Sequence, residues 1–519
     1  MPRHAGETMK ARPRGRRSHW ETGVRMGAAS AKSAAQPALA GGDPRKWWIL
    51  SVVTLTAFVT NLDGTIVIIG LPRMVAGLHI TVTTGLWALT SYIITSTVFL
   101  LPAGRWSELV GQKRIFMGGL AIFTAATFLC GIAPTGTWLL AYRFIQGTGA
   151  ALALATATPI IVRAFRPSEL GRALGINSVS WVAGAIVGPV AGGVLVSTLG
   201  WRSIFFVTIP FAIAGVVGGW RILRDQVPSR GAATDWAGAI TFGLAVTSLL
   251  VALSMGQAWG WSSLNTLGLF FATVVLAAFF VRIEQRHAAP MFDLGLLGHP
   301  HYRSGLGVTV SYSIGYFATT FLLTIYLQGA AHLSPLDAGL MLVPLSAPQL
   351  VMGPLGGVLA DRYGPARLVA AGVLLLAAGG FWLGHLGPHF EVLPMVFPLL
   401  LMSAANGLAW PALTKAVMSS APGERTGTAS GMFYTFRNVG MALSLTLALV
   451  VAEVSLPPRI ASEVYLGTAN LLRPALKGAL IHATNTAFWA FVGFYLLAFL
   501  LALPLLRARP RSASEGRQA

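Results

Sequence analysis

The sequence has few charged residues and almost no cysteine. Asp, Glu, Lys and Arg make up only 10% of its 519 residues, against about 25% in an ordinary soluble domain. So few charges cannot cover the surface of a water-soluble particle of this size, which excludes a soluble enzyme, a coiled coil and a disordered chain. The single cysteine, Cys130, lies in an apolar run. It cannot form an intrachain disulfide, and we interpret it as a small buried residue, with a reactive thiol as the alternative.

Sequence patterns of catalysis and of metal binding are also absent. No GxxxxGK[ST] motif is present, so ATP is not expected to drive this chain. There is no GxSxG motif, no paired-carboxylate pattern and no His/Cys ligand spacing, and His299 with His301 alone are poor evidence for a metal. We therefore expect neither enzyme activity nor a metal or organic cofactor.

Long hydrophobic runs dominate the sequence. Hydrophobic residues make up 54% of the chain, and the mean hydropathy is +0.67. About 20 consecutive apolar residues cross a bilayer as a helix, and fourteen such runs are present. They lie near residues 48–71, 85–103, 115–133, 137–162, 173–197, 203–220, 236–255, 264–281, 304–328, 337–359, 367–386, 392–414, 428–452 and 483–506. The sequence predicts an all-α polytopic membrane protein with fourteen transmembrane helices.

The positive charges predict how these helices are oriented. The formal net charge is +20, and placing the N-terminus inside puts most of the 37 Lys and Arg residues on that side of the membrane. Cytoplasmic loops carry such an excess, so both termini are expected to be cytoplasmic and the protein to lie in the plasma membrane. The charge then faces anionic lipid, not nucleic acid. Residues 1–46 and 507–519 are expected to be cytoplasmic tails, the first of them basic and disordered; the twin arginines Arg16–Arg17 lack the short apolar region of a cleaved signal.

An internal repeat divides the chain into two halves. Gly104, Glu108, Gly111 and Arg114 recur, at one constant separation, as Gly357, Asp361, Gly364 and Arg367, with Arg362 beside the second acid. Each copy follows an equivalent span. Further on, Pro167-Ser-Glu169 and Pro422-Gly-Glu424 stand before equivalent spans. We expect six-helix bundles at 47–222 and 303–506, separated by two inserted helices and a loop at 223–302. Such repeats are typical of secondary transporters.

Several short motifs stand in order along these spans. They are Leu62-Asp63-Gly-Thr65, Gly104–Arg114, Arg143-Phe-Ile-Gln146-Gly147, Gly184-x3-Gly188-Pro189-x2-Gly192-Gly193, Asp235-Trp236 and Gly427-Thr-Ala-Ser430-Gly431 with Arg437-Asn438. Together they resemble the major facilitator superfamily, and within it the fourteen-helix drug:proton antiporter branch (the EmrB/QacA type). The resemblance spans roughly 45–506, although Glu108 and Leu109 stand where the family has Asp and Arg.

Two ionisable residues inside the predicted spans are candidates for proton coupling. Asp63 is the one acid placed in the interior of a span; a lone carboxylate there is costly unless it is paired, protonated or hydrated. It could therefore gain and lose a proton with its surroundings, or form a fixed ion pair. Arg143 is the cation of the same half. By resemblance both serve proton coupling, and the alternative for Arg143 is a packing hydrogen bond with Gln146.

The remaining candidates concern packing, gating and substrate. By resemblance Gly184, Gly188, Pro189, Gly192 and Gly193 form the antiporter motif that seals the halves, and small residues there also suit close helix packing. The two repeat loops are expected to act as cytoplasmic gates. Arg437 could contact an anionic substrate or reach the cytoplasmic face, and Gln146 is a second candidate contact. Asn177, Gln328, Gln349 and Asn406 are interpreted as packing hydrogen bonds rather than ligands.

The resemblance implies an exporter of hydrophobic drugs or antibiotics, driven by the proton-motive force through alternating access. The composition, rich in Ala, Gly and Arg, indicates a bacterial source. The expected partners of this exporter are a small hydrophobic or cationic substrate and membrane lipid, with the proton as coupling ion and a monomer as the functional form. Two alternatives stay open: a proton-coupled carrier of a lipid, siderophore or amino acid, and a membrane receptor that does not transport. No role is assigned to the predicted outer loop 453–482.

Overall fold

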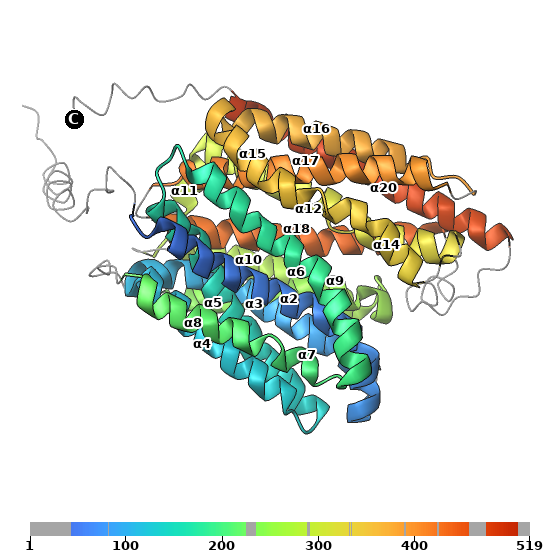
Figure 1. Cartoon of the computed structure of the whole chain (residues 1–519), viewed down its shortest axis with the longest axis horizontal. Coiled ribbons are helices and arrows are strands. Elements are labelled where there is room, and N and C mark those ends of the chain that lie inside the picture. The colour runs from blue at the N-terminus through green and yellow to red at the C-terminus, as the bar shows by residue number, and fades with distance from the viewer. Residues whose placement is uncertain are drawn as a thin grey trace, which may run out of the picture. The chain divides into compact units, whose positions relative to one another are not determined.

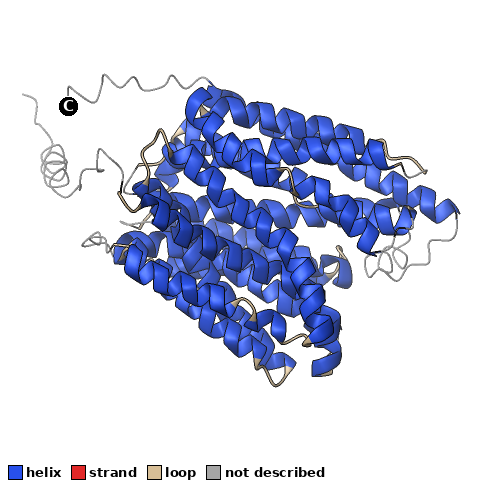
Figure 2. Cartoon of the chain, viewed as in Figure 1, coloured by secondary structure: helices blue, strands red, loops and turns tan. Residues whose placement is uncertain are grey.

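The computed structural model describes residues 43–506 except 81, 225–234, 288–290, 332, 334, 389–390, 423–424 and 456–473. Every element of regular secondary structure in these residues is a helix (Figure 2). Residues 1–42 and 507–519, which make up nearly all of the two predicted tails, lie outside the described residues, as does most of the predicted outer loop 453–482.

The first predicted bundle consists of five long helices and a broken one (Figure 1). They are α2 Lys46–Leu78, α3 Val82–Val110, α4 Gln112–Gly131, α5 Gly136–Ala164, α6 Leu170–Thr198, α7 Ser203–Phe206 and α8 Ile209–Ile222. The last predicted span of this bundle, near 203–220, is interrupted between α7 and α8, where Pro210 occupies the first turn of α8. Within this half α2 packs against α6, and α5 packs against both α3 and α4.

The inserted segment forms α9 Trp236–Trp259 and α10 Leu264–Glu284, which pack against each other, followed by the short α11 Leu294–Gly298. Polar caps explain where these helices begin. The Asp235 side chain accepts a hydrogen bond from the Gly238 N–H, and the Ser263 hydroxyl accepts one from the Thr266 N–H. Each cap satisfies a backbone donor that the first turn leaves without a partner.

The second predicted bundle contains more interrupted helices than the first. Its elements are α12 Pro300–Tyr316, α13 Thr319–Ile325, the π-helix η1 Tyr326–Ala330, α14 Pro335–Ser346, α15 Gln349–Tyr363, α16 Pro365–Leu383, α17 Val392–Ser419, α18 Thr426–Ser455 and α20 Pro474–Leu506. Here α16 packs against α17 and α20, and α12 against α18 and α20.

Twelve helical stretches of the described residues are long and apolar enough to cross a membrane. The predicted count of fourteen is therefore not confirmed. The two predicted spans outside the twelve, near 304–328 and 428–452, are nevertheless helical. The first is divided between α12, α13 and η1, and the second lies within α18. The all-helical membrane architecture agrees with the sequence-based expectation.

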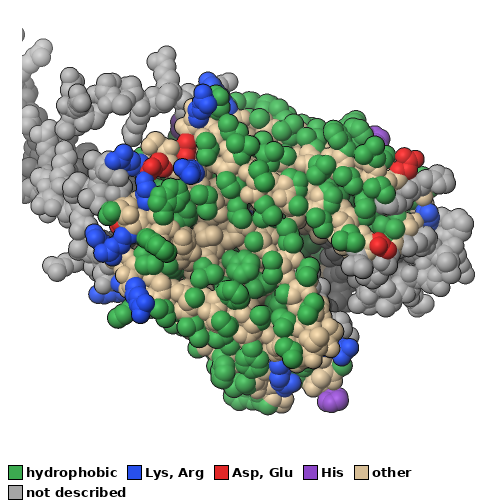
Figure 3. All heavy atoms as spheres, viewed as in Figure 1, with side chains coloured by type: hydrophobic (Ala, Val, Ile, Leu, Met, Phe, Trp, Pro, Cys, Tyr) green, Lys and Arg blue, Asp and Glu red, His purple; other side chains and the backbone are tan. Residues whose placement is uncertain are grey.

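The surface is consistent with a lipid environment. Hydrophobic side chains are spread over the whole face seen in Figure 3, with few charged ones between them. Large apolar side chains such as Leu264, Trp220 and Phe271 are exposed on helices. Lys and Arg gather at the end of the bundle where α3 meets α4 and α15 meets α16, which we call the charged end (Figure 3). A water-soluble protein rarely exposes such extensive apolar surface.

Candidate functional site

Asp63 is the buried acid at the centre of the first bundle. Its helix, α2, carries the carboxylate to a position with no solvent exposure. One carboxylate oxygen accepts a hydrogen bond from Arg143 Nη1 at 2.7 Å, and the other accepts one from Gln146 Nε2 at 2.9 Å. Both predicted coupling residues, Asp63 and Arg143, are thus brought together in an ion pair by α2 and α5.

The cation of this pair is held by three further contacts. Arg143 Nε donates to the Ala88 carbonyl at 3.0 Å, and Nη1 donates to Gln146 Oε1 at 2.6 Å. The guanidinium also lies over the Tyr92 ring, 4.4 Å from its centroid. A buried charge needs such partners because the interior cannot solvate it. We call Asp63, Arg143, Gln146, Tyr92 and Thr127 the carboxylate centre.

Gln146 and Thr127 complete this centre. Gln146 Nε2 donates to Thr127 Oγ1 at 2.7 Å as well as to Asp63, so the amide is fully engaged and buried. Gln146 therefore lies inside the carboxylate centre in this conformation, not on a surface that a substrate reaches. Sequence reasoning did not find Tyr92 or Thr127, because neutral polar residues are frequent in membrane spans and carry no special spacing.

The glycine-rich motif of α6 lies against α2 of its own bundle. Thr65 Oγ1 donates to the Gly184 carbonyl at 3.1 Å, and a Cβ placed on Gly188 would collide with the Thr65 hydroxyl. Gly192 is buried, Gly193 is exposed with open space around it, and the side chain of Pro189 lies outside the described residues. The motif therefore positions the helix that carries Asp63.

Contact between the two bundles instead involves earlier residues of α6. A Cβ on Gly175 would lie against the Gly353 carbonyl of α15, and a Cβ on Gly171 against the Gly357 carbonyl. On the other side of the molecule α3 packs against α18 in the same way, with Gly104 against the Gly427 carbonyl. Such close approach requires residues without side chains.

Glu108 of the first repeat joins α3 to the second bundle at the charged end. Its carboxylate accepts hydrogen bonds from the Thr428 backbone N–H at 2.7 Å and from the Thr428 hydroxyl at 3.1 Å. Arg105 Nη1 lies 2.9 Å from the same carboxylate. Because Thr428 is in the first turn of α18, the acid caps a helix N-terminus, where unpaired N–H groups and the helix dipole favour a negative charge.

Asp361 of the second repeat makes the reciprocal contact. It accepts hydrogen bonds from the backbone N–H groups of Gly171, at 2.8 Å, and Arg172, at 2.9 Å, in the first turn of α6. Lys415 Nζ lies 2.5 Å from the same carboxylate. Each bundle therefore supplies an acid that caps a helix of the other bundle.

The other repeat residues have separate roles. Gly111 and Gly364 precede α4 and α16 with φ values of 110° and 88°, a backbone conformation that favours glycine. Arg114, Arg362 and Arg367 are exposed and form no ion pair with a described residue. The capping partners and Lys415 were missed from the sequence, although the repeated Pro-x-Glu segments before α6 and α18 marked where those helices begin.

Arg437 lies between the bundles against three aromatic rings. Its guanidinium carbon is 4.8 Å from the centroid of Phe317, 5.0 Å from that of Trp181 and 5.4 Å from that of Trp410. Trp181 comes from α6, whereas Trp410 and Arg437 come from α17 and α18. We call these four residues the arginine cage.

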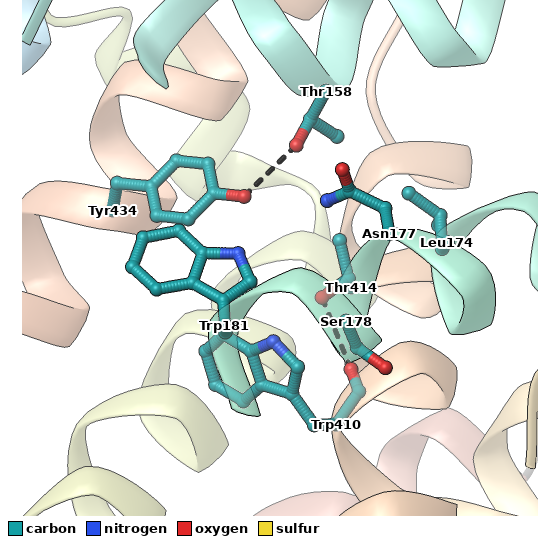
Figure 4. A pocket seen from close by; sticks show the side chains of 8 residues that line it. All are labelled: Thr158, Leu174, Asn177, Ser178, Trp181, Trp410, Thr414 and Tyr434. Carbon is teal, nitrogen blue, oxygen red and sulfur yellow. Dashed lines mark hydrogen bonds between the residues drawn. The ribbon is translucent and has the colours of Figure 1, made fainter. Parts of the chain in front are cut away.

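A small cavity adjoins the arginine cage (Figure 4). Its lining combines hydroxyl, amide and indole groups from α5, α6, α17 and α18, namely Thr158, Leu174, Asn177, Ser178, Trp181, Trp410, Thr414 and Tyr434. The Thr158 and Tyr434 hydroxyls lie 3.0 Å apart and connect the two bundles. The cavity is therefore lined by helices of both predicted bundles.

A hydrogen-bond network of the second bundle lies beside the cage. Gln349 Nε2 donates to the Tyr316 hydroxyl at 2.9 Å, and Asn406 Nδ2 donates to Gln349 Oε1 at 2.5 Å. The Tyr312 hydroxyl donates to Asn406, and its ring lies 5.8 Å from that of Trp410. Gln349 and Asn406 thus bond to each other, while the side chain of Gln328 lies outside the described residues.

Comparison with known proteins points to one family. The profile described as Major Facilitator Superfamily matches residues 53–445. The chain is 29% identical over 402 residues to the tetracenomycin C resistance and export protein of Streptomyces glaucescens, covering 77% of this chain and 74% of that protein. It is 30% identical over 482 residues to the puromycin resistance protein pur8 of Streptomyces alboniger, covering 92% and 94%.

A solved structure agrees on the fold. The human organic anion transporter MFSD10 superimposes with a TM-score of 0.60 over 89% of this chain and 100% of that one, at 16% sequence identity. At this identity the likeness concerns the arrangement of helices alone.

Proposed function

The chain belongs to the Major Facilitator Superfamily, and on that premise we propose that it exports hydrophobic drugs or antibiotics in exchange for protons. It is a multi-pass membrane transporter rather than an enzyme. In the proposed mechanism the two six-helix bundles expose a shared site alternately to either side of a bacterial plasma membrane. The proton is the coupling ion, no cofactor takes part, and the monomer is the functional form.

We propose that fourteen helices cross the membrane, as in the drug:proton antiporter branch of the family. Two segments beyond the twelve apolar stretches would complete this number. The α18 helix is 30 residues long, and the chain from Pro300 to Ala330 is helical except for a turn at Phe317 and Ala318. Arg437 lowers the hydropathy of α18, which a binding role between the bundles would explain.

The charged end is proposed to face the cytoplasm, with both chain termini on that side, because cytoplasmic loops carry an excess of Lys and Arg. The bundles are joined at this end by the caps of Glu108 and Asp361. The structure would then represent a state closed toward the cytoplasm. Opening that end requires both caps to break.

The single observation that carries the proton-coupling proposal is the buried ion pair of Asp63 and Arg143. A proton bound to Asp63 would cancel its charge and break the ion pair, leaving Arg143 to its remaining bonds with Ala88 and Gln146. Because α6 packs on α2 beside Asp63, the protonation state would alter the packing of a helix that also contacts α15. This connection links proton binding to the movement of the bundles.

The relatives named for resistance to tetracenomycin C and puromycin support an antibiotic as the exported compound. Efflux of these two antibiotics and of a panel of dyes from cells that express the chain would test the proposal. We expect export that collapses with a protonophore and in Asp63→Asn. Glu391→Gln, at an exposed acid before α17, is the matched control and should export normally.

Two results would contradict this assignment. Export that persists in Asp63→Asn, or in the presence of the protonophore, would exclude Asp63 as the coupling acid. Proton-dependent transport of an amino acid, siderophore or lipid without export of any antibiotic would favour a carrier of a physiological solute. Absence of every transport activity in a folded, membrane-inserted protein would favour a receptor.

A further inference from the structure

We propose that the arginine cage binds the acidic edge of a planar aromatic substrate, such as a phenolate or carboxylate on a fused-ring compound. This inference rests on the proposed export function and specifies its substrate class. It replaces the broad expectation of hydrophobic or cationic compounds by a preference for anionic aromatic ones.

The first observation is that Arg437 has unused hydrogen-bonding capacity. Its Nη1 donates to Asn438 Oδ1 at 3.3 Å, and its buried Nε has no acceptor among the described residues. No described acid forms an ion pair with it. A guanidinium carries five N–H donors in a planar fork and stays charged at any physiological pH. The cage therefore presents a permanent positive charge with donors to spare.

Asn438 fixes the position of this arginine. Its Oδ1 accepts from Arg437, while its Nδ2 donates to Thr97 Oγ1 of α3 at 3.0 Å. Asn438 thereby contacts α3 of the first bundle, and its neighbour Arg437 contacts α6 of that bundle at Trp181. An arginine held in this way is preorganised for a ligand and loses little conformational freedom on binding.

The second observation is the composition of the adjoining cavity. Its eight lining residues include two indoles and four hydroxyl side chains but no Asp or Glu (Figure 4). Tyr434 of the lining is three residues before Arg437 and so lies on the same face of α18. Asp63, the buried acid of the first bundle, is already occupied by Arg143 and Gln146. A cationic substrate would find no counter-charge here and would be repelled by Arg437.

The rings explain the aromatic part of the preference. Indole and phenyl faces stack on planar compounds, and a guanidinium over such faces keeps its edges free for bidentate hydrogen bonds to an anion. Trp181 belongs to the first bundle and Arg437 to the second, so separation of the bundles would take the cage apart. Binding would therefore depend on how the two bundles are placed relative to each other.

Binding of three matched probes to the purified full-length protein, measured by isothermal titration calorimetry in detergent, tests the proposal. Alizarin is a planar hydroxyanthraquinone with acidic phenols, anthraquinone is its neutral parent, and ethidium is a planar cation. At a pH where alizarin is ionised, we expect it to bind at least about tenfold more tightly than the other two, the order expected of one charge-assisted contact.

Variants assign this preference to the cage. Arg437→Gln should weaken alizarin binding by about tenfold or more and leave anthraquinone binding unchanged, and Arg437→Lys should fall between, because it keeps the charge but loses the planar fork. Arg202→Gln is the matched control, because Arg202 lies outside the cage and over the ring of one aromatic residue, Trp201. Its guanidinium carbon is 4.3 Å from the centroid of that ring. It should bind alizarin as the wild type does.

The outcomes separate this proposal from that of export. Equal alizarin affinity in the wild type and Arg437→Gln, or tighter binding of ethidium than of alizarin to the wild type, would overturn the cage as an anion site whether or not antibiotics are exported. A preference for alizarin that Arg437→Gln removes, found in a protein that transports nothing in proteoliposomes, would support the cage and contradict export.

Discussion

The carboxylate of Glu108 in α3 accepts a hydrogen bond from the backbone N–H of Thr428 in α18, 2.7 Å away and 320 residues later in the chain. Asp361 makes the equivalent contact with Gly171 in the opposite direction, at 2.8 Å. The two repeat loops therefore exchange caps between the bundles. An acid is what this contact requires, because helix N-termini attract negative charge.

Removing the charge of a cap should loosen the charged end. Glu108→Gln keeps an oxygen acceptor but loses the charge, which is worth roughly 1 kcal/mol at a helix N-terminus and should shift the opening equilibrium about fivefold. The thiol of a Ser178→Cys variant in the cavity lining then becomes easier to reach. The rate at which a maleimide labels this introduced thiol measures the opening. The native Cys130 is buried and should contribute little to the labelling.

The exposed Arg114 of the same loop supplies the control for this prediction. It forms no ion pair with a described residue, so Arg114→Gln should leave the labelling rate unchanged. Equal acceleration by Arg114→Gln and Glu108→Gln would mean that the overall charge of the loop, and not the cap, closes this end.

Glycine at 104 should be irreplaceable although it lies within a helix. A Cβ there would meet the backbone carbonyl of Gly427, so Gly104→Ala is expected to destabilise the protein by about 1–3 kcal/mol through overpacking. Gly118→Ala in α4 meets nothing within 4 Å and should instead stabilise by roughly 0.5–1 kcal/mol. Thermal unfolding in detergent distinguishes them, and similar effects of both variants would contradict the close approach of α3 and α18.

The ion pair of the carboxylate centre should show strong coupling between its members. Asp63→Asn leaves Arg143 buried without its counter-charge, and Arg143→Gln does the same to Asp63, each costing about 3–5 kcal/mol. The double variant should lose much less than the sum, because neither charge then remains. Unfolding free energies of the four proteins form a double-mutant cycle. Additive losses would show that the two charges do not depend on each other.

A surface ion pair should give a small acid-dependent effect. The hydrogen bond from Lys46, followed by the charges of Lys46 and nearby arginines, lowers the pKa of Glu169 from its ordinary value. A lowered pKa in the folded protein adds stability above the ordinary glutamate pKa, and this is lost as the pH falls through the lowered value. The unfolding temperatures of wild type and Lys46→Gln should therefore differ slightly at neutral pH and converge in acid. A difference that grows in acid would contradict the assigned cause.

Much of the helical architecture could be predicted because hydropathy and internal repeats can be recognised in the sequence without knowledge of tertiary contacts. Runs of apolar residues predicted the helices. The recurrence of Gly104 and Glu108 as Gly357 and Asp361 led to the prediction of two halves. Interruptions within helices were harder to predict. The run from 304 to 328 is continuous in sequence, yet a turn at Phe317 and Ala318 divides it between α12, α13 and η1 in the structure.

The chemical types at the candidate site were also available from the sequence. Asp63 and Arg143 were singled out because ionisable groups inside a membrane span are costly and must find partners. Whether they pair with each other is not a local property, since α2 and α5 are separated by two helices along the chain. The tertiary structure alone decided that the Asp63 carboxylate accepts hydrogen bonds from both Arg143 and Gln146.

The sequence by itself thus indicated a helical membrane protein with an internal repeat, an acid within a membrane span and an acid at the equivalent position of each repeat loop. Only the tertiary structure decided that Glu108 caps α18, that Asp361 caps α6 and that Arg437 lies among Trp181, Phe317 and Trp410. The reason is physical: burial of apolar length fixes which segments become helices, whereas pairing depends on which helix faces meet when the bundles pack.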